Sequence, residues 1–210
     1  IKLRGISIDS GEVMADMWLA MSTDPDVDEP IEGIETKEPA FGLPAIWVYE
    51  DQKEDAEVAG YTVVNASAVV STHLTEVIKR HSADILSRQD VEDLLNNVRR
   101  NSEALVNDLV PDPLSASDIH VVLQNLLRER VSIRDMVSIL EALSYHCRVK
   151  KDPDYLTEQA RMVLSRSICK QYMGGDGALP ALTLAPELEE HLAQGLSEDG
   201  QMIAVGPVIT

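Results

Sequence analysis

Residues 111–146, PDPLSASDIHVVLQNLLRERVSIRDMVSILEALSYH, decide the fold of this chain, because they contain two helix patterns in tandem. The first pattern begins at Ser115, which is followed three residues later by Asp118. The second begins at Ser132, which is followed by Asp135 at the same spacing. A serine oxygen at the N-cap accepts an unpaired backbone N–H, and an acid in the first turn suits the positive end of the helix. We therefore predict two helices capped by Ser115 and Ser132.

Apolar side chains recur at helical spacing after both start signals. They are Ile119, Val122, Leu123, Leu126 and Leu127 in the first pattern, and Ile133, Met136, Val137, Leu140 and Leu143 in the second. Such stripes cover one face of a helix that packs on a core. Only residues 128–131 separate the two patterns. A connection this short is typical of a tight helical hairpin or a helix-turn-helix.

The composition indicates a folded protein with an aliphatic core and a strongly acidic surface. Of the 210 residues, 44% are hydrophobic, only one is Phe and two are Trp, and the net charge is -18. This charge disfavours nucleic acid and anionic membranes as partners of the whole surface. No apolar run is long enough to span a membrane. Because the chain starts with Ile and shows no signal peptide, we expect it to be a piece of a longer protein.

The N-terminal part alternates short strands with helices. Strands are predicted over residues 2–9, 17–21, 45–49 and 61–64. Helices are predicted over residues 50–60 and 66–86, with Asn65 as the cap of the second. The acidic stretch 22–39 carries three prolines and is expected to be loop-rich. This order of elements favours α+β or α/β packing.

From Ser87 onward, helix patterns follow one another. Five are predicted, beginning at Ser87, Asn101, Ser115, Ser132 and Tyr155, the last ending at Tyr172. A glycine-rich joint over residues 173–178 precedes a predicted strand at 179–184, a helix at 186–196 and a strand at 202–209. Hinges are expected at this joint and near residues 85–87, because few apolar residues bridge them.

The predicted fold class is α+β with several subdomains. We expect an α/β part over residues 1–86 that holds two intertwined subdomains, and a helical subdomain over residues 87–165. Residues 166–210 are expected to start a small α/β subdomain that is truncated, since so short a piece cannot close a core alone.

No catalytic, cofactor or metal site emerges, so we predict that the chain is not an enzyme. No phosphate-binding loop is present, and Gly174, Gly175 and Gly177 follow a helix pattern instead of preceding one. The histidines are scattered without metal-ligand spacing, and the acids of residues 24–29 lack the Gly and Glu of a calcium loop. The two cysteines are expected to be reduced thiols.

A helix-turn-helix DNA-binding regulator is an alternative for residues 115–146. Phosphate contacts supply much of the affinity for DNA, so a reading helix needs a basic surface. The exposed face of the second helix is expected to present Arg134, Ser138 and Glu141, which is not a basic set. A hairpin that packs on protein is therefore favoured. A hydrolase completed by further C-terminal sequence is a third possibility that no residue supports.

Three segments in order resemble one known family. They are EPAFGLPAIWV (residues 38–48), GYTVVNASAVVSTHL (60–74) and LQNLLRERVSIRDMVSILEAL (123–143), with SRQDVEDLL and LVPDPLS between the last two. Together they resemble the cytoplasmic domain of the export gate family of type III secretion, over roughly residues 1–196. The family has a flagellar branch and an injectisome branch. Pro44 and the acid-rich loop 24–35 depart from the flagellar pattern, so the injectisome branch stays open as the alternative.

The resemblance implies a place in a secretion apparatus. The full-length protein would be integral to the bacterial inner membrane, and its C-terminal part would lie on the cytoplasmic face as a soluble domain of four subdomains. That part would form a nine-membered ring below the export channel. The implied partners are export chaperones with bound substrates, the export ATPase complex with its stalk protein, and further copies of the chain. No cofactor and no nucleic acid are implied.

The resemblance also implies a docking site for chaperones, a dimple between the first two subdomains. The matching positions here are Glu38, Phe41, Val64, Val69 and Thr72, with Glu38 at the rim, where the flagellar pattern has Asp. Phe41 is the only Phe of the chain and lies in a loop shaped by Pro39 and Gly42. Aromatic anchors in apolar pockets carry much of the binding energy of an interface. The alternative is that Phe41 is an ordinary core residue.

Overall fold

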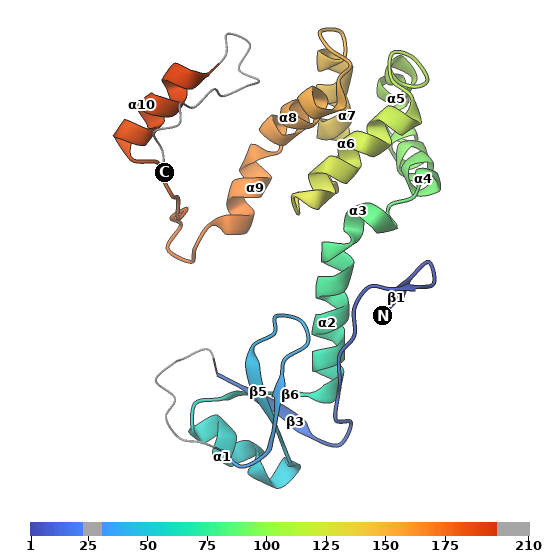
Figure 1. Ribbon diagram of the computed structural model, residues 1–210. Helices are drawn as coiled ribbons and strands as arrows, with labels where there is room; N and C mark the ends of the chain where they lie inside the picture. Colours follow the sequence, from blue (N-terminus) through green and yellow to red (C-terminus); the bar gives the residue numbers. More distant parts are fainter. Residues whose placement is uncertain (23–30, 197–210) are drawn as a thin grey trace. The chain divides into compact units, whose positions relative to one another are not determined.

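The computed structural model describes residues 1–22 and 31–196, and its fold is α+β as the sequence predicts (Figure 1). Residues Ile1–Leu164 form one compact unit, and the residues from Ser165 onward form a second. None of the helices in the described ranges combines the length and the apolar composition needed to cross a membrane.

A four-stranded antiparallel sheet lies at one end of the first unit. Its strands, in the order β4-β5-β3-β6, are β4 (Ile34–Lys37), β5 (Pro44–Val48), β3 (Trp18–Met21) and β6 (Thr62–Asn65). Side chains alternate between the two faces of a strand. Leu19 and Trp47 therefore pack with Val69 on one face, whereas Ala20 and Val48 pack with Ala56 on the other. The sheet is buried on both faces at its centre, and the predicted strands at 17–21, 45–49 and 61–64 are confirmed.

One prediction for the N-terminal part is wrong, and one short strand was not predicted. Residues 2–9 form a hairpin of β1 (Lys2–Leu3) and β2 (Ile6–Ser7), because Arg4 and Gly5 have φ of 50° and 85°, as a tight hairpin turn requires. The stretch expected to be loop contains β4, an edge strand without the alternating burial that would reveal it. The rest of that acidic stretch, residues 23–30, lies outside the described residues.

Helices cover the sheet on both faces. The predicted short acidic helix consists of a 3-10 turn, η1 (Glu50–Gln52), and α1 (Lys53–Val58). Asn65 caps α2 (Ala66–Arg80) by accepting a hydrogen bond from the backbone N–H of Ala68, as predicted. The predicted helix does not run unbroken to residue 86: it breaks at His81, and α3 (Ser82–Ile85) follows. The Ser82 hydroxyl donates to the carbonyl of Lys79, a local bond that competes with helix continuation.

Five helices follow in the rest of the first unit. They are α4 (Arg88–Arg99), α5 (Glu103–Leu109), α6 (Ala116–Arg128), α7 (Met136–His146) and α8 (Pro153–Val163). Each contributes fully buried leucine, namely Leu95, Leu109, Leu123, Leu140 and Leu156. The apolar stripes read from the sequence are thus the faces on which these helices pack.

The joint between α3 and α4 is bridged by side chains of α6. Gln124 donates from Nε2 to the carbonyl of Ala83, and Nε2 of His120 lies 2.9 Å from the carbonyl oxygen of Leu86. Ala83 and Leu86 are both buried. The joint is therefore packed more closely than expected, and the hinge near residues 85–87 stays a prediction.

The helical hairpin confirms the first predicted cap and corrects the second. Ser132 does not cap a helix; its hydroxyl accepts from the N–H of Arg134, and residues 129–135 connect α6 to α7. Asp135 is the N-cap instead, because its carboxylate accepts from both the N–H and the hydroxyl of Ser138. The connection is longer than predicted, and Ile133 lies within it.

A reciprocal capping box holds the start of α6, and we predict its contribution to stability. The Asp118 carboxylate accepts from the N–H and the hydroxyl of Ser115 at 2.8 and 2.7 Å, and the Ser115 hydroxyl accepts from the N–H of Asp118. Ser115→Ala is expected to lower the free energy of unfolding by about 1 kcal/mol in urea titrations. Ser71→Ala, at an exposed position inside α2, is the control and should change it little. An equal loss in both variants would contradict the capping role.

The same bonds predict a dependence of stability on pH. The Ser115 hydroxyl and N–H lower the pKa of Asp118 below 3.8, and Ser87 lowers the pKa of Asp90 in the same way at the start of α4. A carboxyl whose pKa is lowered by folding contributes stability above its ordinary pKa and loses it as the pH falls through the lowered value. The free energy of unfolding should therefore fall as the pH drops below about 4. Asp118→Asn should show a shallower fall, and an unchanged slope would contradict this.

The second unit contains α9 (Ser165–Tyr172) and α10 (Pro186–Gly195) among its described residues. The predicted helix over 155–172 is divided at Leu164 into α8 and α9, and the helix predicted at 186–196 is confirmed. The strand predicted at 179–184 is wrong, because these residues form neither strand nor helix and are exposed. A strand needs a paired neighbour, and the sheets of the described residues lie in the first unit. The strand predicted at 202–209 lies outside the described residues.

Candidate functional site

A shallow apolar pocket of about 230 Å³ lies between α2, the β3–β6 edge of the sheet and the loop before β5. Its lining consists of Met21, Glu38, Phe41, Leu43, Thr62, Val64, Ala68, Val69 and Thr72. All the site residues predicted from the sequence line this pocket, although they come from three separate segments. No group of three or more potential metal ligands occurs in residues 1–22 and 31–196.

Phe41 is 62% exposed beside the pocket. The alternative in which it is a core residue is therefore wrong. Its neighbour Gly42 has φ of 72°, in the left-handed region that glycine adopts without strain. A tight turn thus presents the only aromatic ring of the lining to solvent.

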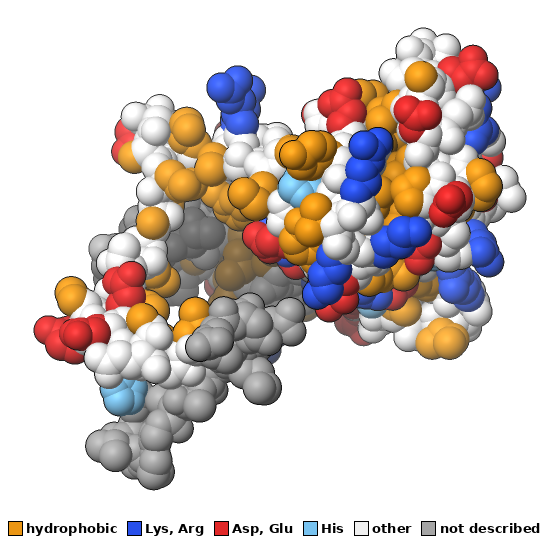
Figure 2. Space-filling view, turned by 90° about the horizontal axis from the view of Figure 1, so that it is seen from above, with side chains coloured by type: hydrophobic (Ala, Val, Ile, Leu, Met, Phe, Trp, Pro, Cys, Tyr) orange, Lys and Arg blue, Asp and Glu red, His pale blue; other side chains and the backbone are white. Residues whose placement is uncertain are grey.

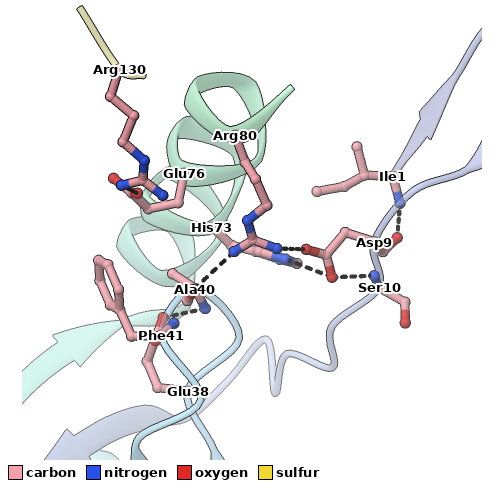
Figure 3. A network of polar contacts seen from close by, with 10 residues as sticks. All are labelled: Ile1, Asp9, Ser10, Glu38, Ala40, Phe41, His73, Glu76, Arg80 and Arg130. Atoms are coloured by element: carbon pink, nitrogen blue, oxygen red, sulfur yellow. Dashed lines mark hydrogen bonds and ion pairs between the residues drawn. The ribbon is translucent and has the colours of Figure 1, made fainter. Parts of the chain in front are cut away.

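Glu38 is buried, not exposed at the rim as expected, with 3% of its surface accessible. Its carboxylate accepts from the N–H of Ala40 at 2.9 Å and from the N–H of Phe41 at 2.7 Å (Figure 3). The N–H of Gly42 donates back to the carbonyl of Glu38. Glu38 therefore determines the shape of the loop that carries Phe41.

The remaining predicted residues form the floor and one wall. Val64 extends from β6, opposite Leu19 of β3, and Val69 is 2% exposed within the core cluster beneath the sheet. Thr72 is exposed on α2, one turn beyond Ala68. Val69 is thus shared between pocket and core, whereas Thr72 can be changed with little effect on packing.

Some lining residues were missed by sequence reasoning. They are Met21, Leu43, Thr62 and Ala68. Strand alternation could have indicated Thr62, which lies two residues before Val64 on the same face, and helical spacing could have indicated Ala68 from Thr72. Met21 pairs with Thr62 across β3 and β6, a register that the sequence alone does not give.

A polar network lies beside the loop that carries Phe41 (Figure 3). Arg80, at the end of α2, contacts Oδ2 of Asp9 with Nη1 at 3.0 Å and donates from Nη2 to the carbonyl of Ala40 at 3.5 Å. Nε2 of His73 lies 3.4 Å from Oδ1 of Asp9. The hydrogen bond from the N–H of Ser10, aided by the nearby His73 and Arg80, lowers the pKa of the Asp9 carboxyl. Asp9 is therefore the anion on which this network converges.

The helical hairpin does not provide a DNA-reading surface. Exposed positions of α7 are Val137, Glu141 and Tyr145, which carry no positive charge, and Arg134 lies in the connection before the helix. On the face shown in Figure 2, Lys and Arg side chains are interspersed with Asp and Glu. Such a surface does not favour contact with a phosphate backbone.

Comparison with known families matches residues 1–209 to the FHIPEP family. The flagellar biosynthesis protein FlhA of Bacillus subtilis strain 168 is 40% identical over 212 residues, which cover 100% of this chain and 31% of that protein. FlhA of Escherichia coli K12 is 40% identical over 200 residues, covering 95% of this chain and 29% of that protein. The chain thus spans about a third of the length of the curated relatives that it matches.

Solved structures show the same fold. The CdsV protein of Chlamydia pneumoniae superimposes with a TM-score of 0.81 at 26% identity, over 98% of this chain and 60% of that one. CdsV has also been solved in complex with the CdsO protein, where the TM-score is 0.75 at 25% identity, over 98% of this chain and 59% of that one. Nonameric SctV-C of EPEC gives a TM-score of 0.64 at 22% identity, over 94% of this chain and 60% of that one.

Proposed function

The chain belongs to the FHIPEP family, and from this premise we propose that it is a docking and gating part of the export gate of a type III secretion apparatus. Its proposed ligands are export chaperones with bound substrates. The flagellar branch is favoured because the curated relatives with 40% identity are flagellar, whereas CdsV shares 26%. An injectisome export gate for virulence effectors is the alternative.

We propose further that the full-length protein places this part at the cytoplasmic face of the inner membrane, in a ring of identical subunits. The nonameric assembly of EPEC SctV-C supports a ring of nine. The complex of CdsV with CdsO supports a second protein partner beside the chaperones. We propose that this partner is the export ATPase complex with its stalk protein, as the family resemblance implies.

The observation that carries the docking proposal is the exposed ring of Phe41 beside a preformed apolar pocket. Glu38 already holds the backbone of the loop through two hydrogen bonds, so little conformational entropy is lost when a partner binds. A rigid aromatic ring next to a hydrophobic floor is the arrangement of an interface anchor and its pocket. An apolar side chain of a chaperone–substrate complex would fill the space between Phe41 and Thr72.

We propose binding and not catalysis at this site. Among the lining residues only Glu38 is titratable, and both of its carboxylate oxygens accept backbone hydrogen bonds. A general base must reach the proton that it abstracts, and this carboxylate faces the loop instead.

A single charge placed in the pocket tests the proposal. Thr72→Asp would put a carboxylate in the apolar wall, where desolvation on binding is costly. Thr75→Asp is the matched control, since Thr75 is also exposed on α2 but does not line the pocket. With a purified flagellar chaperone–substrate complex from the same organism, calorimetry should show at least tenfold weaker binding for Thr72→Asp, and parental affinity for Thr75→Asp.

Two outcomes would contradict docking of a flagellar complex at Thr72. Equal affinity of Thr72→Asp and the parent would place docking elsewhere on the chain. Binding of an injectisome chaperone complex, in place of the flagellar one, at the same residues would assign the chain to the alternative branch.

A further inference from the structure

We infer that Asp9, Gly11 and Arg80 are positioning residues of the pocket: they hold the loop of residues 38–43 against α2 without lining the pocket themselves. The expected effect of these residues on chaperone affinity rests on the proposed function. Their expected effect on the position of the loop does not.

The guanidinium group of Arg80 connects three segments, namely the N-terminal segment, the Phe41 loop and α2. Its Nη1 contacts the Asp9 carboxylate and its Nη2 donates to the carbonyl of Ala40, so the N-terminal segment and the Phe41 loop are both tied to α2 (Figure 3). A planar guanidinium presents two terminal nitrogens to two acceptors in fixed directions, whereas the donors of an ammonium group all rotate about one nitrogen. Because α2 also carries Thr72, Arg80 relates the loop to the opposite wall of the pocket.

Gly11 supplies a steric contact at the same place. A Cβ at this position would lie 2.8 Å from Cβ of Pro39 and 3.1 Å from Cε1 and Nδ1 of His73. The backbone at Gly11 therefore lies directly against the start of the loop and against α2. Any larger residue must push Pro39 away, and Pro39 is two residues from Phe41.

The pair of His73 and Asp9 anchors the N-terminal segment to α2 next to Gly11. His73 is 6% exposed, and its Nε2 is the one buried side-chain nitrogen or oxygen in the described ranges without a hydrogen bond. It faces Oδ1 of Asp9, whose other oxygen faces Arg80. The neighbouring Glu76 pairs instead with Lys79 and Arg130. The carboxylate of Asp9 thus lies between two groups of α2.

Glu38 and Arg80 therefore have different tasks. Glu38 shapes the loop through bonds within it, and Arg80, with Asp9 and Gly11, determines where the loop lies relative to α2. Loss of the hydrogen bonds of Glu38 would unfold the turn. Loss of the contacts of Arg80 would release the loop from α2, so that the hydrogen bonds within its turn open to solvent more often.

Hydrogen exchange on the uncomplexed chain tests the positioning role. In Arg80→Ala, the backbone amides of Ala40, Phe41 and Gly42 should exchange about tenfold faster, while amides of β3 and β5 keep their parental rates. Lys79→Ala is the matched control: Lys79 neighbours Arg80 and pairs with Glu76, but does not touch the loop. It should leave the exchange of the loop unchanged. Gly11→Ala should speed exchange of the same loop amides.

Arg80→Lys separates positioning from general stability. Lys keeps the ion pair with Asp9, so the melting temperature should return to the parental value. It lacks the second terminal nitrogen that donates to Ala40 in Arg80, so the loop amides should still exchange fast. The affinity for the chaperone–substrate complex should fall at least threefold in Arg80→Ala and stay parental in Lys79→Ala.

Parental exchange rates of the loop amides in both Arg80→Ala and Gly11→Ala would overturn the inference. Faster exchange of the loop without any loss of chaperone affinity would overturn the predicted effect of positioning on binding. If the parent chain binds no chaperone complex, the proposed function fails, and the exchange rates still decide whether Arg80 and Gly11 position the loop.

Discussion

Phe41→Ala is expected to weaken binding of an export chaperone–substrate complex about thirtyfold, with almost no change in melting temperature. Truncating a central aromatic anchor costs about 2 kcal/mol or more, which corresponds to this factor. The ring is 62% exposed, so its removal leaves no internal cavity. A fully buried Phe would instead cost about 3–5 kcal/mol of stability. The expected result is thus a large loss of affinity in a fully stable protein.

Affinity and melting temperature should be measured on the same Phe41→Ala preparation. Tyr49→Ala is the control, because Tyr49 is 59% exposed in the same unit but does not line the pocket. It should bind like the parent. A large fall in melting temperature for Phe41→Ala, with parental affinity in the folded fraction, would show that the ring packs the fold and does not anchor a ligand.

Leu123→Ala is expected to lower the free energy of unfolding by about 2–5 kcal/mol. Leu123 is fully buried on α6, the helix that packs against α3, α4 and α8. Its truncation removes buried methyl groups and leaves a cavity that the surrounding helices fill only in part. Val121→Ala is the control on the same helix, at a position that is 39% exposed, and should cost much less.

The same variant tests whether residues Ile1–Leu164 unfold as one body. Both tryptophans, Trp18 and Trp47, lie in the sheet, whereas circular dichroism reports mainly on the helices. Since Gln124 of α6 hydrogen-bonds to α3, we expect both signals of Leu123→Ala to shift to the same lower urea midpoint. A shift of the helical signal alone would contradict a single cooperative unit.

The helices were predictable where a local signal decides them. Ser115 and Asp118 are three residues apart and satisfy each other's backbone groups, so sequence spacing suffices. Ser132 has the same spacing to Asp135, but Asp135 finds a better donor pair in Ser138, and the later cap prevails. Two competing caps in one segment cannot be ranked from the sequence.

The edge strand β4 was not predicted, and the strand predicted at 179–184 does not form. The reasons for the two errors are opposite. β4 is exposed and is defined by its pairing with β5, so apolar periodicity does not mark it. Residues 179–184 have strand-like composition but no strand beside them in the described part of the chain. Propensity describes a residue's fit to a sheet, and only the tertiary fold supplies the neighbour.

The pocket could be predicted from the sequence only in part. Its five predicted residues came from a family resemblance, and their meeting in one place depends on how β6 and α2 pack against the loop. The contact between Asp9 and Arg80 joins residues 71 positions apart, and no local pattern indicates it. Exposure of Phe41 was likewise undecided by sequence, because a lone aromatic residue suits a core as well as an interface.

Chemical-shift mapping of the chain with a chaperone–substrate complex shows which surface the complex contacts. With methyl groups of Leu and Val labelled, titration with a purified flagellar complex should shift Leu43, Val64 and Val69 of the pocket. Leu94 and Val137, which line a groove between α4 and α7, should keep their shifts. Shifts confined to Leu94 and Val137, with the pocket methyl groups unchanged, would contradict docking at Phe41.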